Sequence, residues 1–139
     1  MPRNPTITDW RGKRVWLVGA SSGIGAAMAR ELAGRGARVA LSARSADKLA
    51  ALAIQDALLL PCDATETAGL AAARIALLNA WGGVDLVIYL AGDYVPMRAD
   101  DFDLDVAEKV ITVNFNGAMR LAATVLPDLH PGGGIAFVA

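Results

Sequence analysis

Short apolar segments alternate with longer segments of helical periodicity along nearly the whole chain. The apolar segments cover residues 14–20, 37–44, 57–65, 84–92 and 133–139. The helical segments cover residues 24–36, 45–56, 66–83 and 103–129. Nearly continuous apolar strands separated by helices are typical of a parallel sheet that is covered on both faces. With right-handed crossovers, the sequence predicts an α/β fold: one domain over residues 1–139, a doubly wound parallel sheet of the Rossmann-like type that is truncated after the fifth strand.

Composition and charge exclude several classes of function. The net charge of −1 gives no basic surface for a nucleic acid or an anionic membrane. Residues 1–14 lack the apolar core of a signal peptide, and no uncharged apolar stretch is long enough to cross a bilayer. Cys62 is the only cysteine, so we expect no internal disulfide, a cytoplasmic location and a small buried core residue at this position.

A glycine cluster marks the junction between the first strand and the first helix. In "VGASSGIG" the glycines are Gly19, Gly23 and Gly25, and Ser21 and Ser22 lie between them. Missing β-carbons let a pyrophosphate approach the backbone, and the free N–H groups of a helix N-terminus attract it. The alternative is a turn that serves only tight strand–helix packing. A P-loop is excluded, because no Lys-Ser or Lys-Thr follows the last glycine.

The end of the second strand indicates which dinucleotide would bind. An acidic residue about 20 positions beyond the glycines would hold the ribose 2′-hydroxyl of NAD. Here "LSAR" supplies Ala43 and Arg44 instead. A guanidinium suits a 2′-phosphate, so the sequence favours NADP(H) over NAD(H). The missing carboxylate also argues against an S-adenosylmethionine methyltransferase. The alternative for Arg44 is a solvated side chain at the start of the next helix.

The motifs "GASSGIG", "LSAR", "CDAT", "YLAG" and "VNFNG", in this order, resemble those of the short-chain dehydrogenase/reductase family. The resemblance runs from about Lys13 to Ala139 and implies an NADP(H)-dependent oxidoreductase that interconverts a carbonyl and an alcohol on a small molecule. The chain departs from the family's Asn-Asn-Ala-Gly motif, because Tyr89 and Leu90 replace the two asparagines. The implied cofactor-binding residues are Gly19, Ser21, Ser22, Gly23, Ile24, Gly25, Arg44, Asp63, Ala64, Ala91 and Gly92.

The resemblance assigns roles to four of the later positions. Asp63 would accept a hydrogen bond from the adenine amino group, with Ala64 alongside, and Ala91 and Gly92 would leave room for the ribose. Asn114 would be the catalytic asparagine that holds a water in a proton relay. The alternatives are a helix-capping role for Asp63 and a satisfied interior side chain for Asn114.

The family's remaining catalytic groups are a serine beyond the fifth strand and a Tyr-x-x-x-Lys pair, and the chain ends before both. Tyr94 and Arg98 do not substitute for that pair, because Pro96 lies between them and an arginine does not deprotonate usefully. We therefore expect the cofactor-binding half of a reductase, inactive by itself. The alternative is a non-catalytic dinucleotide-binding or assembly module.

The remaining features give no second site. His130 has no partner at catalytic or metal-binding spacing, so we expect a surface loop residue. The aspartates at 100, 101, 103 and 105 are interpreted as a solvated helix entrance, and no metal is expected. An unpaired edge on the last strand, or the long helix at 106–126, favours a homo-oligomer.

Overall fold

Five parallel strands form one sheet in the order β3-β2-β1-β4-β5 in the computed structural model, which describes residues 6–138. The strands are β1 (Arg14–Val18), β2 (Arg38–Ser42), β3 (Leu58–Leu59), β4 (Val84–Tyr89) and β5 (Leu129–Phe137). The first three strands progress toward one edge of the sheet, and β4 and β5 progress toward the other. The order therefore reverses between β1 and β4, which confirms the predicted doubly wound parallel sheet.

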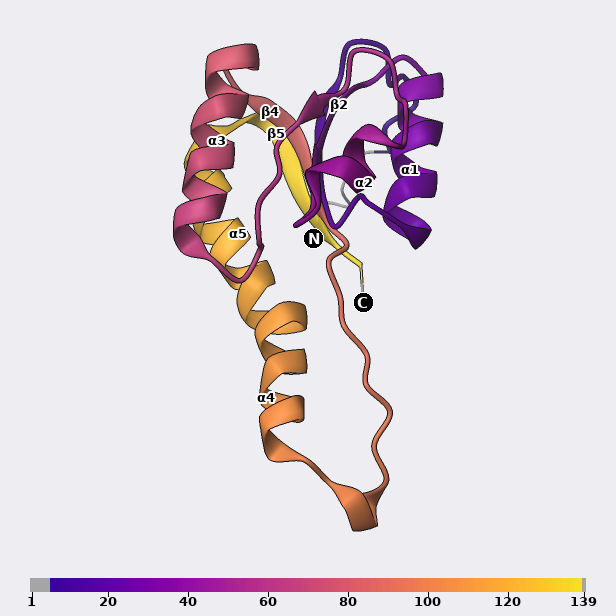
Figure 1. Ribbon diagram of the computed structural model, residues 1–139. Coiled ribbons are helices and arrows are strands. Elements are labelled where there is room, and N and C mark those ends of the chain that lie inside the picture. Colours follow the sequence, from indigo (N-terminus) through magenta and orange to yellow (C-terminus); the bar gives the residue numbers. More distant parts are fainter. Residues whose placement is uncertain (1–5, 139) are drawn as a thin grey trace.

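Helices cover both faces of this sheet. They are α1 (Gly23–Gly34), α2 (Ala46–Ala50), α3 (Thr67–Trp81), α4 (Leu104–Ile111) and α5 (Gly117–Val125), and a π-helical turn at Thr112–Asn116 joins the last two. Figure 1 shows α1 and α2 on one side of the strands and α3 and α5 on the other. The segment between β4 and α4 extends away from the sheet before the chain returns through α4 (Figure 1). Among the described helices, none has both the length and the apolar character needed to cross a membrane.

Alternate residues of the strands supply two separate cores. In β1, Trp16 and Val18 pack with α3 and α5, whereas Val15 and Leu17 pack with α1. All four side chains are at most 2% exposed. Because successive side chains of a strand point to opposite faces, an almost uninterrupted apolar strand is the pattern that this two-sided burial requires.

One buried polar residue links three parallel segments. The Ser42 side chain is fully buried at the end of β2. Its Oγ atom accepts the indole N–H of Trp16 at 2.8 Å and donates to the Leu60 carbonyl at 2.7 Å. Both hydrogen-bonding capacities are thus used, so this hydroxyl is buried without an unsatisfied group.

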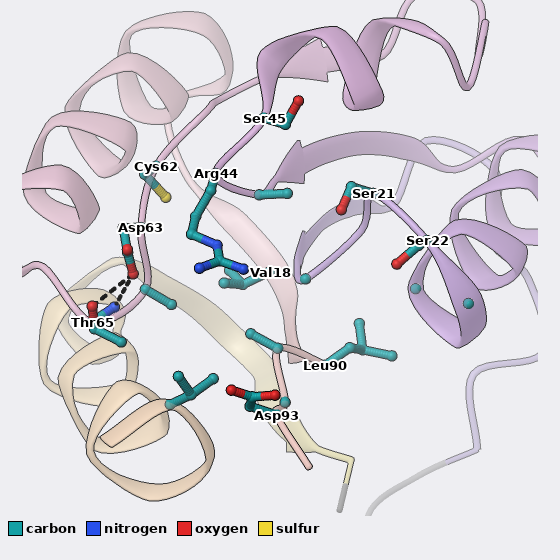
Figure 2. Close-up of a pocket in the computed structure, with 18 of the residues that line it drawn as sticks. Val18, Ser21, Ser22, Arg44, Ser45, Cys62, Asp63, Thr65, Leu90 and Asp93 are labelled. Carbon is teal, nitrogen blue, oxygen red and sulfur yellow. Dashed lines mark hydrogen bonds between the residues drawn. The ribbon is translucent and has the colours of Figure 1, made fainter. Parts of the chain in front are cut away.

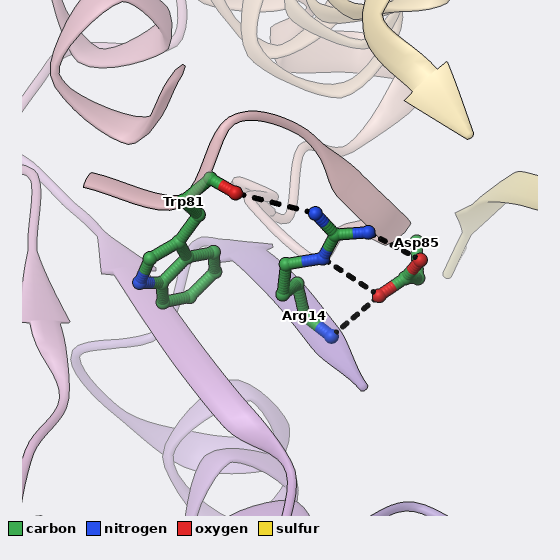
Figure 3. Close-up of polar contacts among 3 residues, drawn as sticks. All are labelled: Arg14, Trp81 and Asp85. Carbon is green, nitrogen blue, oxygen red and sulfur yellow. Dashed lines mark hydrogen bonds and ion pairs between the residues drawn. The ribbon is translucent and has the colours of Figure 1, made fainter. Parts of the chain in front are cut away.

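An ion pair joins β1 to β4 at the end of the sheet where these strands begin (Figure 3). The Asp85 carboxylate accepts hydrogen bonds from the Arg14 Nε at 3.0 Å, from its Nη2 at 3.0 Å and from its backbone N–H at 2.8 Å. The Arg14 Nη1 atom also donates to the Trp81 carbonyl at the end of α3, at 3.2 Å. This bidentate pair fixes two central strands and a helix relative to one another, away from the ends at which ligands bind in such sheets.

Two elements are shorter than the sequence predicts. The helix expected at 45–56 ends at Ala50, because Ala53 and Asp56 adopt left-handed conformations with φ of 51° and 59°. The strand expected at 57–65 is reduced to Leu58–Leu59. Pro61 follows closely and has no N–H group to continue the ladder.

Three side chains also lie differently from expectation. Ile24 is an apolar residue of the first helix, yet it is 65% exposed, and Gly25 and Ala26 take the inner positions. Cys62 is only half-buried. His130 lies within β5 with its imidazole against Gly83, so the expectation of a surface loop is wrong. Ala139, expected in the fifth strand, lies outside the described residues.

Candidate functional site

A pocket of about 720 Å³ lies at the carboxyl ends of β1, β2 and β4 (Figure 2). This is the position at which ligands bind in doubly wound sheets, beside the reversal of strand order. The pocket is lined by every residue that the sequence assigned to cofactor binding: Gly19, Ser21, Ser22, Gly23, Ile24, Gly25, Arg44, Asp63, Ala64, Ala91 and Gly92. Residues separated by more than 70 positions in the sequence thus share one pocket.

Each of the three glycines of the turn lacks a β-carbon for a different structural reason. A β-carbon on Gly19 would lie 2.3 Å from the Ala91 nitrogen, so this glycine lets β1 approach the end of β4. A β-carbon on Gly25 would lie 2.1 Å from the Gly19 carbonyl oxygen, so this one lets α1 pack on the turn. Gly23 has φ of +53° and no atom within 4 Å of the added carbon. Only Gly23 therefore leaves open space for a ligand.

The N-terminus of α1 faces the same pocket. Its N-cap, Ser22, is extended, and its hydroxyl makes no capping hydrogen bond. The first intrahelical-type bond runs from the Ala26 N–H to the Ser22 carbonyl at 3.1 Å. The N–H groups of residues 23–25 have no acceptor within the helix, because the first turn of a helix has none. These donors and the helix dipole together favour an anionic group in the pocket.

Arg44 is one of three cationic side chains that line this site, together with Lys48 and Lys109. It follows the end of β2, and its guanidinium points into the centre of the pocket, toward the side of Asp63 and Val18 (Figure 2). The side chain is exposed to solvent through the pocket. No acidic residue lies at the corresponding position of β2, since Ala43 precedes Arg44 and Ser45 follows it. An anion that enters the pocket thus meets a guanidinium as well as the helix N-terminus.

Asp63 shapes the opposite wall of the pocket. Its Oδ1 atom accepts the Thr65 backbone N–H at 2.8 Å and the Thr65 hydroxyl at 2.7 Å. These two hydrogen bonds lower the pKa of Asp63, and the charge of Arg44 lowers it further. The N-cap of α3 is Glu66, so Asp63 organises the preceding turn and does not cap the helix. Its Oδ2 atom takes part in neither bond to Thr65.

The wall after β4 is held by side chains from the π-helical turn. Asn114 Oδ1 accepts the Asp93 N–H at 2.7 Å, and Asn114 Nδ2 donates to the Asp93 carbonyl at 2.9 Å. Asn114 does not itself line the pocket, although Thr112 and Val113 of the same turn do. The Tyr89 hydroxyl donates to the Val113 carbonyl at 2.5 Å. Both contacts tie the end of β4 to the turn.

Several lining residues were missed by the sequence reasoning. They are Val18, Ala43, Ser45, Lys48, Cys62, Thr65, Leu90, Asp93, Lys109, Thr112 and Val113. Lys48 carried a detectable signal, because it lies one helical turn beyond Arg44. Lys109 carried none, because only the path of the chain between β4 and α4 brings it to the pocket. Burial raises the pKa of the Cys62 thiol.

Neither tyrosine of the chain is placed as an acid–base group. Burial raises the pKa of Tyr89 to about 12, and its hydroxyl is bonded to a carbonyl. Tyr94 is 82% exposed and does not line the pocket. Over residues 6–138, no group of His, Cys, Asp and Glu side chains is arranged to hold a metal ion. Neither phenol of residues 6–138 therefore lines the pocket.

Comparison with known proteins gives consistent relatives. Residues 13–139 match the family model described as short chain dehydrogenase. The human and mouse proteins named dehydrogenase/reductase SDR family member 7 are 34% and 33% identical over 140 residues, which covers 87% of this chain and 41% of each relative. An uncharacterized oxidoreductase of Staphylococcus haemolyticus is 30% identical, over 91% of this chain and 57% of that protein.

Solved structures agree in fold. A short-chain dehydrogenase/reductase from Serratia marcescens superposes with a TM-score of 0.85 at 27% identity, over 93% of this chain and 56% of that one. A short chain dehydrogenase from Burkholderia cenocepacia, solved in complex with NADP, gives a TM-score of 0.85 at 29% identity, over 94% and 56% of the two chains. The chain thus spans about half the length of the relatives that it matches. With a pocket at the switch point of a doubly wound sheet and a family match over residues 13–139, this chain belongs to the short-chain dehydrogenase/reductase family.

Proposed function

We propose that this chain binds NADP(H) and supplies the cofactor-binding part of an oxidoreductase that interconverts a carbonyl and an alcohol on a small molecule. The observation that carries the proposal is the shared pocket of the uncapped α1 N-terminus and the inward-pointing Arg44 guanidinium. Two anionic groups are expected of this cofactor, a diphosphate and a 2′-phosphate. The pocket offers one cationic or dipolar partner for each.

The residues present fit this cofactor. The volume of about 720 Å³ lies within the usual range for small-molecule and cofactor sites. The open space at Gly23 would take the diphosphate beside the free N–H groups, and Arg44 would pair with the 2′-phosphate. Asp63 would accept a hydrogen bond from the adenine amino group, and the small residues Ala91 and Gly92 would border the ribose. When bound, the cofactor would supply or accept the hydride.

A second candidate is dinucleotide binding without catalysis by this chain. It is supported by the positions of the two tyrosines: one is buried and hydrogen-bonded, and the other lies outside the pocket. General acid–base transfer needs a group within hydrogen-bonding reach of the substrate. We therefore expect the purified chain to bind nucleotide without reducing a carbonyl. Carbonyl reduction by the pure chain would contradict this part of the proposal.

A titration with NADPH and NADH tests the cofactor assignment. Loss of a charge-assisted hydrogen bond costs about 1.5–3 kcal/mol, so Arg44→Ala should weaken NADPH binding about 10- to 100-fold and leave NADH binding nearly unchanged. Arg30→Ala is the matched control, because Arg30 is an exposed arginine on α1 that does not line the pocket. If Arg44→Ala leaves the ratio of the NADPH affinity to the NADH affinity unchanged, Arg44 does not pair with the 2′-phosphate. Failure of both nucleotides to bind the wild-type chain would refute the function itself.

Self-association is a further part of the proposal. Five apolar side chains between the start of α4 and the turn after α5 are more than half exposed: Leu104 (61%), Ile111 (54%), Phe115 (60%), Met119 (52%) and Leu126 (59%). Exposed apolar residues gathered along one helical segment favour burial against a partner. We expect a homo-oligomer of this chain through that segment. The cytoplasmic location stays a prediction from the single cysteine.

A further inference from the structure

Tyr89 lies where the family motif has an asparagine, and it is the last residue of β4. Its side chain is 2% exposed, yet its hydroxyl reaches the Val113 carbonyl, 24 positions away, at 2.5 Å. Burial holds the pKa of the phenol at about 12. The hydroxyl therefore keeps its proton, and acts as a donor, over the whole pH range in which a protein of this kind is studied.

The π-helical turn changes the hydrogen bonding around the Val113 carbonyl. In an α-helix this carbonyl would accept the N–H of Gly117, four residues later. Here the Gly117 N–H donates to the Thr112 carbonyl, five residues back. The Gly117 N–H is therefore directed away from the Val113 carbonyl, and this carbonyl accepts the Tyr89 hydroxyl from the sheet. Such π-turns are often found at functional sites.

Gly117 provides the space for the phenol. A β-carbon on Gly117 would lie 2.2 Å from the Tyr89 hydroxyl oxygen, 3.2 Å from its Cζ atom and 3.2 Å from the Ala64 carbonyl. The hydroxyl thus occupies the volume that any other residue at 117 would need. A substitution at either Tyr89 or Gly117 should therefore change the effect of a substitution at the other.

The same turn builds one wall of the pocket. Thr112 and Val113 line the pocket, and Asn114 holds both the N–H and the carbonyl of Asp93, which lines it as well. A shift of the turn would therefore move the helical wall and the loop after β4 together. We propose that Tyr89 is a positioning residue: its phenol, in the space left by Gly117, fixes the π-helical turn so that Asn114 clamps Asp93 and sets the shape of the pocket.

This inference relies on the proposed function only for the identity of the ligand. Removing the hydroxyl in Tyr89→Phe leaves the ring in place and the Val113 carbonyl without its donor. We expect NADPH to bind about fivefold more weakly, measured well below the melting temperature so that the chain stays folded. Tyr94→Phe is the matched control, because Tyr94 is the other tyrosine and is exposed outside the pocket.

Amide hydrogen exchange gives a readout that general destabilisation would not produce. In Tyr89→Phe the Asp93 amide, which donates to Asn114, should exchange about tenfold faster than in the wild type. The Leu90 amide, which donates to the Val18 carbonyl at 2.7 Å in the sheet, should be unchanged. Equal acceleration of both amides would mean that Tyr89 supports only global stability and would overturn the proposal.

A double variant tests the dependence between the two residues. Gly117→Ala should lower the melting temperature by about 10 °C, because the added carbon meets the phenol. Adding Tyr89→Phe should raise the melting temperature again, since the hydroxyl is then gone. Additive losses would contradict the coupling. If the wild-type chain binds neither nucleotide, the proposed function fails, whereas the exchange and rescue measurements still decide the role of Tyr89.

Discussion

The Asn114 side-chain amide holds both backbone polar groups of Asp93: Oδ1 accepts the Asp93 N–H at 2.7 Å, and Nδ2 donates to the Asp93 carbonyl at 2.9 Å. The two residues are 21 positions apart and join the π-helical turn to the loop after β4. A side-chain amide that matches a backbone amide in this way uses a donor and an acceptor at once. The side chain that the resemblance assigns to catalysis thus has a clear structural partner. Its role in a proton relay stays a prediction.

Replacing Asn114 by alanine should loosen the loop after β4. Both hydrogen bonds to Asp93 are lost, and each contributes about 1 kcal/mol. We expect faster exchange of the Asp93 amide and NADPH binding weakened about tenfold, measured by hydrogen exchange and by fluorescence titration. Asn79→Ala is the control, because Asn79 is exposed on α3 and does not line the pocket. Unaltered exchange at Asp93 would show that the clamp does not hold the loop.

Substitutions at two glycines of the turn should distinguish an effect on packing from an effect on ligand binding. Gly25→Ala places a carbon 2.1 Å from the Gly19 carbonyl oxygen and should destabilise the fold by about 3 kcal/mol. Gly23→Ala adds only the strain of a left-handed alanine, about 1–2 kcal/mol, because nothing lies within 4 Å of the added carbon, and Gly23 lines the pocket, so we expect weaker NADPH binding. Thermal melting and NADPH titration distinguish the two outcomes.

Gly34→Ala provides the control for both substitutions. Gly34 is in the same helix, has no neighbour within 4 Å of an added carbon, and should gain about 0.5–1 kcal/mol. If Gly23→Ala binds NADPH as tightly as Gly34→Ala does, the open space at Gly23 is not where the ligand lies.

Stability should depend on pH through the pair of Arg14 and Asp85. Hydrogen bonds from Arg14 hold the pKa of Asp85 below its usual value, and the charge of the nearby His130 lowers it slightly further. Because the folded pKa is depressed, the stabilisation is complete above the unfolded pKa of about 3.9 and is lost as the pH falls through the folded pKa. Asp85→Asn should cost about 1–3 kcal/mol at pH 7.

The difference between wild type and Asp85→Asn should therefore shrink in acid, as measured by urea unfolding from pH 7 to pH 2. Asp100→Asn is the control, because Asp100 pairs with Arg98 at the surface, where both side chains are more than 70% exposed. Exposed pairs contribute little, so no difference is expected for it at any pH. A constant difference for Asp85→Asn down to the lowest pH would contradict the ionic origin of its effect.

The proposed self-association should depend on the exposed apolar residues of the last helical segment. Phe115 is 60% exposed, so Phe115→Glu should leave the melting temperature of the monomer unchanged and abolish the oligomer. Light scattering at several concentrations measures this. Ile75→Glu is the control, because Ile75 is 55% exposed on α3 and is not part of that segment. A wild-type chain that stays monomeric at all concentrations would contradict the prediction.

The sequence predicted the architecture because its signals are local or periodic. Apolar strands between amphipathic helices lead to a sheet with two cores, and in β1 alternate residues indeed enter different cores. Gly19, Gly23 and Gly25 were recognisable because a missing β-carbon is a property of the residue itself. Every residue assigned to the cofactor lies in one pocket, although its contact with a cofactor stays a proposal.

Other features were wrong or invisible in the sequence. The short α2 and β3 reflect left-handed residues at 53 and 56 and a proline at 61, which periodicity does not register. His130 looked like a loop residue because of the proline and glycines around it, yet pairing of β5 with β4 places it in a strand. Lys109 reaches the pocket only through the path of the chain after β4.

By itself, then, the sequence determined the sheet, its two cores and the glycine turn, since each depends on properties that residues carry in any context. The tertiary structure alone decided the wall of the pocket. There Tyr89, Val113 and Gly117 meet through a π-helical turn, and Asn114 meets Asp93. Water satisfies these hydrogen-bonding groups in the unfolded chain. They need a partner within the protein only once the helix and the sheet pack together, so no local pattern could predict these contacts.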